Sequence, residues 1–92
     1  MTIKEVRAMF AVGSRWHAMR EDHLPGGKHA DENRTVKRAS TKDIVFELEG
    51  GKLFFTAWPK STEIIEARDG HLSFQYGTRG PKVTLERIAV EA

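Results

Sequence analysis

Apolar residues occupy every second position of residues 44–48 and of residues 53–57, on both sides of the dipeptide Gly50-Gly51. Alternation of this period is typical of a β-strand with one buried face, and two glycines readily adopt the positive φ angles of a two-residue hairpin loop. Folding the chain at this dipeptide sets Phe46 opposite Phe55 and collects apolar residues on one face. The pattern therefore predicts an antiparallel hairpin whose paired phenylalanines are buried.

The dipeptide Asp69-Gly70 lies at the centre of a second alternating stretch. Asp-Gly is one of the strongest sequence signals for a two-residue hairpin turn. Folding the chain here sets Ile65 opposite Phe74 on an apolar face, whereas the other face is mostly polar. We therefore expect a second hairpin with the same kind of loop.

The first residues of the chain follow a helical period instead. Thr2 and Glu5 match the capping box, in which a threonine hydroxyl and a glutamate carboxylate satisfy free amides at a helix N-terminus. An apolar stripe runs from Ile3 to Phe10 at helical spacing. We expect a short helix over residues 3–11 that packs on the sheet, because a helix of this length is not stable alone.

The rest of the chain has weaker patterns, which predict strands and one long loop. Residues 13–20 and 34–40 have the alternation of short strands. The segment 21–33 between them contains a proline and paired glycines, so we expect a mobile surface loop there. Two alternatives stay open for residues 82–90: a last strand with Val83 inward, or a segment that turns helical at its end.

These elements add up to six or seven short strands after one short helix. Turns at such short intervals favour a small barrel or a strongly bent sheet. We therefore expect a mainly β fold, a small antiparallel SH3-like barrel or bent sheet over residues 14–90, in a single domain over residues 1–92. A chain of 92 residues suffices for one hydrophobic core and is too short for two domains.

Two resemblances accompany this expectation. The strand lengths, the long first loop and the short later hairpins resemble SH3-like small barrels. A scattered pattern also resembles small proteins encoded by actinobacterial phages, over roughly residues 13–76: Gly13-x-Arg15-Trp16, a glycine-rich loop, Arg34-Thr35-Val36 and Trp58-Pro59-Lys60. The phage proteins carry no agreed activity, and the SH3-like resemblance implies a non-enzymatic binding module by analogy of fold.

Composition narrows the class of protein. Hydrophobic residues make up 39% of the chain and charged residues 30%, which is typical of globular proteins and not of disordered or membrane proteins. No apolar run approaches the roughly 20 residues that span a bilayer, and the chain start is unlike a signal peptide. The absence of cysteine excludes disulfides. We expect a cytoplasmic protein without a membrane partner, in the host cytoplasm if a phage encodes it.

Positive charge gathers in residues 15–42, although the formal net charge is only +2. Within this basic region four cations lie in a stretch without an acidic residue: Arg34, Lys37, Arg38 and Lys42. Such a stretch attracts phosphate, and these side chains are the candidates for nucleic-acid binding. The alternative is a solvated strand face whose charges protect a sheet edge.

The sequence lacks patterns for catalysis or metal binding. His17, His23 and His29 recur every six residues, but this spacing provides no structural basis for a shared metal site. The chain has neither a nucleophile elbow nor a complete phosphate-binding loop. We therefore expect a protein that is not an enzyme, with no catalytic residue, no metal and no cofactor.

Two aromatic residues, Trp58 and Phe54, share the face of the first hairpin that lies opposite the paired phenylalanines. They need either cover from the helix or the last strand, or a partner, and aromatic residues are common energetic centres of protein interfaces. The leading hypothesis is a protein-binding module with Trp58, Phe54 and Lys60 at its interface. Nucleic-acid binding by the basic region and a structural part in a larger assembly are the alternatives, and the oligomeric state stays open.

Overall fold

The computed structural model describes residues 1–21 and 29–89. Helix α1 spans Ile3–Ala8, and a 3-10 turn, η1, spans Ser61–Glu63. Seven strands occur in this described part: β1 (Arg15–Glu21), β2 (His29–Ala39), β3 (Asp43–Leu48), β4 (Leu53–Ala57), β5 (Ile64–Arg68), β6 (His71–Gln75) and β7 (Lys82–Arg87). They form one antiparallel sheet in the order β4-β3-β2-β1-β7-β6-β5. The predicted mainly β fold is confirmed.

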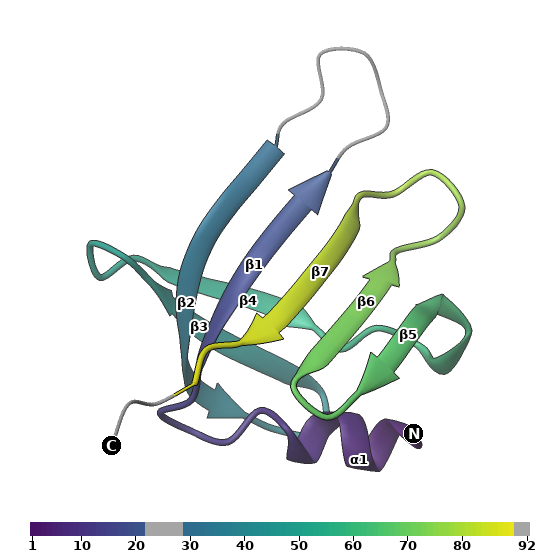
Figure 1. Ribbon diagram of the computed structural model, residues 1–92, viewed down its shortest axis with the longest axis horizontal. Helices are drawn as coiled ribbons and strands as arrows, with labels where there is room; N and C mark the ends of the chain where they lie inside the picture. The colour runs from purple at the N-terminus through teal and green to yellow at the C-terminus, as the bar shows by residue number, and fades with distance from the viewer. Residues whose placement is uncertain (22–28, 90–92) are drawn as a thin grey trace.

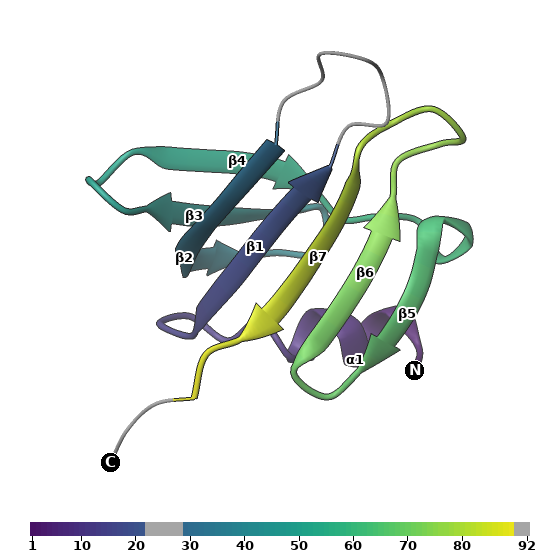
Figure 2. The ribbon, with the colours of Figure 1, turned by 45° about the horizontal axis from the view of Figure 1, so that its top comes forward.

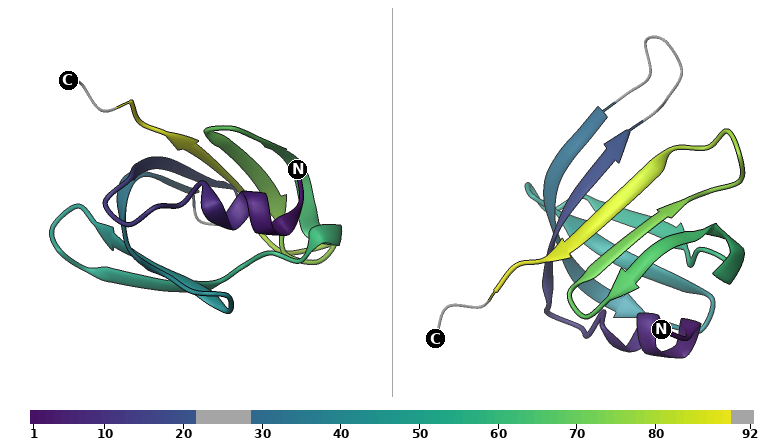
Figure 3. Two further views of the ribbon diagram at one scale, coloured as in Figure 1. Left: turned by 90° about the horizontal axis from the view of Figure 1, so that it is seen from below. Right: turned by 45° about the vertical axis from the view of Figure 1, so that its right-hand side comes forward.

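The sheet is strongly curled and remains open. Among the described strands, β4 and β5 are the two ends and do not pair with each other, as a closed barrel requires. Figures 1 and 2 show β3 and β4 passing behind β1, β2 and β7 and crossing them steeply. Seen from below in Figure 3, α1 lies across one end of the curl. The result is a bent sheet with a concave face that the helix covers at one end.

Helix α1 begins at its predicted cap. The backbone N–H of Glu5 donates to the Thr2 hydroxyl over 3.2 Å, and the N–H of Thr2 donates to the Glu5 carboxylate over 3.0 Å. The helix ends at Ala8 and not at residue 11, because the chain there tightens into a turn that directs Phe10 into the core. The ring of Phe10 stacks on that of Trp16 with centroids 4.1 Å apart, which attaches α1 to the sheet.

The loop between β3 and β4 is one residue longer than predicted. The backbone N–H of Leu48 donates to the carbonyl of Lys52 over 2.7 Å, so the loop contains the three residues 49–51. Both glycines of this loop adopt positive φ, 94° and 88°, which residues with a side chain rarely adopt. A loop of this length shifts the register of the hairpin by one residue, and such a shift exchanges the two faces of the second strand.

The shifted register changes which aromatic residues are buried. Phe46 pairs with Phe54, so the predicted pair of Phe46 with Phe55 is wrong. Phe55 projects outward and is 63% exposed. The predicted register would leave both Phe54 and Trp58 on the outer face, whereas the observed one leaves a single ring of β4 outside, which buries more apolar surface. The hairpin itself is present as expected.

The hairpin of β5 and β6 turns at Asp69-Gly70 with the predicted two-residue loop. A bulge at Ile65 then shifts the register, so that Ile64 pairs with Phe74. The predicted pair of Ile65 with Phe74 is therefore wrong, and Ile65 is exposed. One extra residue in a strand has this effect because it turns the following side chains to the opposite face.

Strand β2 is longer than predicted. It begins at His29, so the predicted loop 21–33 is wrong over residues 29–33, which pair with β1, and at residue 21, which ends β1. The ring of His17 on β1 contacts Asp31 through Nε2 over 2.7 Å and Asn33 through Nδ1 over 2.8 Å. These cross-strand contacts explain why a polar segment continues the ladder. The rest of that predicted loop, residues 22–28, lies outside the described residues.

Strand β7 decides between the two alternatives for the C-terminal segment. Residues 82–87 form a strand that pairs with both β1 and β6, and Val83 and Leu85 are buried in the core. Residue 90 lies outside the described residues.

The helix of the described part is too short to cross a membrane.

Candidate functional site

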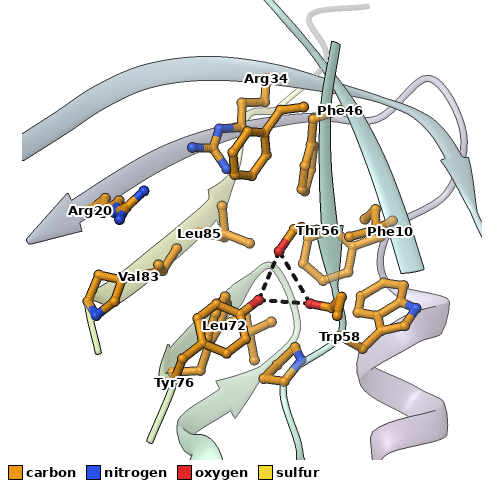
Figure 4. Close-up of a pocket in the computed structure, with 16 residues that line it drawn as sticks. Phe10, Arg20, Arg34, Phe46, Thr56, Trp58, Leu72, Tyr76, Val83 and Leu85 are labelled. Carbon is orange, nitrogen blue, oxygen red and sulfur yellow. Dashed lines mark hydrogen bonds between the residues drawn. The ribbon is translucent and has the colours of Figure 1, made fainter. Parts of the chain in front are cut away.

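The concave face encloses a pocket of about 180 Å³. Its walls come from β3, β4, β6 and β7, with Arg20 of β1, Arg34 of β2, and Phe10 and the segment after β4 at the α1 end. Figure 4 shows the side chains that meet there. We call it the concave pocket. Most lining residues are apolar, and the full lining is Phe10, Arg20, Arg34, Ile44, Phe46, Phe54, Thr56, Ala57, Trp58, Pro59, Leu72, Phe74, Tyr76, Pro81, Val83 and Leu85.

A hydrogen-bonded contact joins the two halves of the curled sheet in the wall of this pocket. The hydroxyl of Tyr76, which follows β6, donates to the carbonyl of Ala57 at the end of β4 over 2.7 Å, and the Thr56 hydroxyl lies 3.0 Å from it (Figure 4). Burial raises the pKa of Tyr76, so its hydroxyl stays protonated and able to donate. This contact holds β4 against β6 without a strand ladder.

Arg34 is the buried cation of the concave pocket, only 6% exposed. Its Nε and Nη2 donate to Oε1 of Glu32 over 3.1 and 2.8 Å. The guanidinium carbon lies 4.6 Å from the ring centroid of Phe54 and 5.5 Å from that of Phe46. A guanidinium stacks well on aromatic faces because it is planar and more weakly hydrated than an ammonium. The aromatic rings and Glu32 together therefore hold this charge inside the fold.

The four cations of the predicted nucleic-acid site do not share one face. Arg34 points into the concave pocket. Lys37, Arg38 and Lys42 are exposed, and Lys37 lies 3.2 Å from Glu47 while Arg38 lies 3.9 Å from Asp43. Strand alternation places Lys37 on the opposite face from Arg34 and Val36, which are buried. A bulge between Val36 and Arg38 shifts the register, so Arg38 does not return to the face of Arg34.

Two of the three residues predicted at a protein interface line the concave pocket. Phe54 and Trp58 are half-buried there, on the face opposite to the one predicted for them. The Trp58 indole N–H donates to the carbonyl of Ser40 over 2.6 Å, and its ring lies 5.5 Å from that of Phe10. Lys60 is exposed and lies outside the pocket lining. The structure therefore brings together Phe54 and Trp58 with Arg34, which the sequence assigned to a different site.

Histidine and acidic side chains form no group of three that could hold a metal ion within residues 1–21 and 29–89. His17 contacts Asn33 and Asp31, as described above. His23 lies outside the described residues, and the side chain of His29 is likewise not described. Among the described residues, the pocket lining contains no histidine either, so the chemistry of this lining is that of apolar contacts, hydroxyls and guanidinium groups.

Sequence reasoning missed Arg20 and Tyr76 as residues of the pocket. A signal for Arg20 was available, because it shares the alternating face of β1 with the buried residues Trp16 and Ala18. Tyr76 carried a similar signal for its direction, because it continues the alternation of the buried residues Leu72 and Phe74, but its partner on β4 could not be predicted. It follows β6 and reaches β4 only because the sheet curls, which is a contact between residues 19 positions apart in the chain.

Glu63 fixes the turn between the pocket and β5. Its carboxylate accepts hydrogen bonds from the backbone N–H of Lys60 over 2.8 Å and from that of Gly77 over 2.9 Å. These backbone hydrogen bonds, that of Lys60 first, lower the pKa of Glu63. The carboxylate thus ties η1 to the residue that follows Tyr76.

The substitution Glu63→Gln is expected to destabilise the protein at neutral pH and to have a smaller effect in acid. The fold holds the pKa of Glu63 below its ordinary value of 4.5, so the stabilising contribution of the carboxylate is complete above that value and is lost as the pH falls through the folded pKa. Urea midpoints at neutral pH and at about pH 3 measure the difference. The control is Glu49→Gln, an exposed loop residue without a side-chain hydrogen bond or ion pair to another described residue. An equal effect of Glu63→Gln at both pH values would contradict this interpretation.

Comparison of the chain with models of known protein families, with curated proteins and with solved structures finds no match. The resemblances to SH3-like barrels and to phage proteins stay predictions. A function must therefore be inferred from the geometry and chemistry of the concave pocket.

Proposed function

We propose that this protein is a non-enzymatic binding module and that the concave pocket binds a small, mainly apolar ligand. The observation that carries the proposal is a preformed cavity whose walls are mostly aromatic and aliphatic. Ligand sites in proteins are typically concave and apolar, with a few polar groups that orient the ligand. Here those groups include the guanidinium of Arg34 and the hydroxyls of Thr56 and Tyr76.

The volume of the pocket limits the size of the ligand. An engineered apolar cavity of about 150 Å³ binds benzene, so a cavity of about 180 Å³ has room for one ring and a small substituent. Burying roughly 150 Å² of apolar ligand surface at about 25 cal/mol per Å² contributes about 4 kcal/mol, which corresponds to a Kd on the order of 1 mM. A neutral ligand with one ring is therefore expected to bind weakly but measurably.

Toluene is a suitable probe of this proposal, because it is apolar, uncharged and of the right size. We expect saturable shifts in amide-detected NMR spectra at the indole N–H of Trp58 and at the amides of Leu72 and Leu85, with a Kd in roughly the millimolar range. The variant Val83→Phe adds a ring to the pocket wall and is expected to abolish these shifts. The control Phe55→Ala removes an exposed ring on the outer face of β4 and should leave them intact.

Overpacking a buried position can destabilise a protein, so Val83→Phe can fail to fold. In that case the location of the toluene shifts in the unaltered protein still tests the proposed site. Shifts confined to Phe55 and its neighbours would contradict the proposal. So would toluene shifts at the pocket residues that persist unchanged in a folded Val83→Phe variant.

Protein binding and nucleic-acid binding stay predictions. For a protein partner, the exposed aromatic ring of the β3–β4 hairpin is Phe55, whereas Phe54 and Trp58 line the pocket. For nucleic acid, the cations Lys37 and Arg38 already have acidic neighbours. Neither surface has the preformed cavity that supports the proposed ligand site.

A further inference from the structure

We infer that the ligand of the concave pocket is a small organic acid with a one-ring apolar body, and that Arg34 binds its carboxylate. This inference rests on the proposed function and specifies the chemistry of the same site. It follows from two features that occur together: apolar walls and a buried guanidinium that faces the cavity. The first feature selects the body of the ligand, and the second selects its head group.

The ion pair with Glu32 leaves donors of Arg34 available. Glu32 engages Nε and Nη2 through the single oxygen Oε1. No acceptor among the described residues makes a hydrogen bond to Nη1. A guanidinium carries five N–H donors, and its two terminal nitrogens form a fork that matches the two oxygens of a carboxylate. The edge formed by Nη1 and Nη2 can therefore donate hydrogen bonds to a second carboxylate.

The charges around the pocket favour an anion. Arg34 faces the cavity, and its partner Glu32 lies outside the lining. Among the described residues, the lining includes no Asp or Glu. A cationic ligand would meet the guanidinium of Arg34 and would find no carboxylate in the described lining to pair with. A neutral ligand would displace water from the edge of Arg34 without supplying a charged acceptor, and leaving a buried donor without a partner costs free energy.

Among anions, the pocket is suited to a carboxylate and not to a phosphate. A phosphate dianion would exchange its water shell for walls that are mainly aromatic and aliphatic, and the cost of such desolvation rises steeply with charge. A carboxylate carries one charge on a planar group that matches the guanidinium fork. Figure 4 shows Arg20 and Arg34 away from Phe10 and Trp58. The ring of a ligand can therefore lie near Phe10 and Trp58 while the carboxylate of the same ligand binds Arg34.

Three probes that share one ring test this inference on the unaltered protein: phenylacetate, phenylacetamide and phenethylamine. We expect phenylacetate to bind about tenfold or more tightly than the amide, because hydrogen bonds to charged groups contribute more than neutral ones. Phenethylamine should bind more weakly than the amide because the pocket repels cations. The NMR shifts described for toluene provide the readout, at one ionic strength and one pH for all three probes.

A double variant, Arg34→Met with Glu32→Gln, tests the assignment to Arg34. Methionine preserves much of the apolar volume of arginine, and glutamine prevents a carboxylate from being left without its partner. We expect phenylacetate and the amide to bind this variant within about twofold of each other, since the charged donor is gone. The control Arg38→Met removes an exposed cation outside the pocket and should preserve the tenfold preference for the acid.

The outcomes separate this inference from the proposed function. If toluene and the amide bind in the pocket but phenylacetate binds no more tightly, the pocket is a neutral apolar site and the inference fails while the proposed function stands. If none of the ring compounds binds, both fail. A preference for the acid that persists in the folded double variant would overturn the assignment to Arg34. If that variant does not fold, Arg34→Lys retains the charge without the fork, and an unchanged preference there would overturn the proposed fork geometry.

Discussion

Phe46→Ala is expected to lower the free energy of unfolding by about 3–5 kcal/mol, and Phe55→Ala by less than about 1 kcal/mol. Phe46 is 1% exposed and packs with its ring 6.3 Å from that of Phe10, whereas Phe55 is 63% exposed on the outer face of β4. Deleting a buried phenyl ring removes its burial energy and leaves a cavity, and deleting an exposed ring does neither.

Denaturant titration of both variants measures this contrast, and it also tests the register of the hairpin. With a two-residue loop at Gly50-Gly51, the two phenylalanines would face the same core and both substitutions would cost several kcal/mol. Similar large losses for Phe46→Ala and Phe55→Ala would therefore contradict the register described here.

Trp16→Ala is expected to destabilise the protein by about 3–5 kcal/mol, and Trp58→Ala by about half as much. Trp16 is fully buried, its ring stacks on Phe10 at 4.1 Å, and its indole N–H donates to the Ser14 hydroxyl over 3.0 Å. Trp58 is half-buried and therefore loses less apolar contact on truncation.

The loss of Trp16 should also release helix α1, because a helix of six residues has little stability without tertiary contacts. Hydrogen exchange of the α1 amides should accelerate in Trp16→Ala more than the exchange of the β6 amides does. A larger loss of stability for Trp58→Ala than for Trp16→Ala in denaturant titration would contradict the arrangement of the core.

Local sequence signals predicted the structure correctly where a few neighbouring residues determine it. The capping box of Thr2 and Glu5 and the turn at Asp69-Gly70 depend on contacts within three or four residues, and both occur as predicted. These elements also account for the confirmed fold class, since a helix start and short hairpin turns limit the possible architectures.

The sequence did not predict the strand register correctly where one extra residue determines which face of a strand is buried. Gly50-Gly51 suits a two-residue loop and a three-residue loop, and the adjacent strand residues are apolar on both faces. Long-range contacts select the longer loop, because they place Phe54 under Arg34 and Trp58 beside Phe10. The bulge at Ile65 is a second case of the same kind.

Arg34 shows why the candidate site itself was only partly predictable. The sequence placed it in a run of cations and so suggested a surface that contacts phosphate. Its inward direction follows from strand alternation with Val36, but its role in a pocket depends on the curl that carries β4 across to Tyr76. That curl arises from contacts between distant strands, which a pattern of neighbouring residues does not contain.

The most direct test of the concave pocket as a binding site is a set of intermolecular nuclear Overhauser effects between toluene and the protein. We predict contacts from the ring protons of toluene to the methyl groups of Leu72 and Leu85, both of which line the pocket. Contacts only to Leu53 and Ile65, which are exposed outside it, would contradict the proposed site.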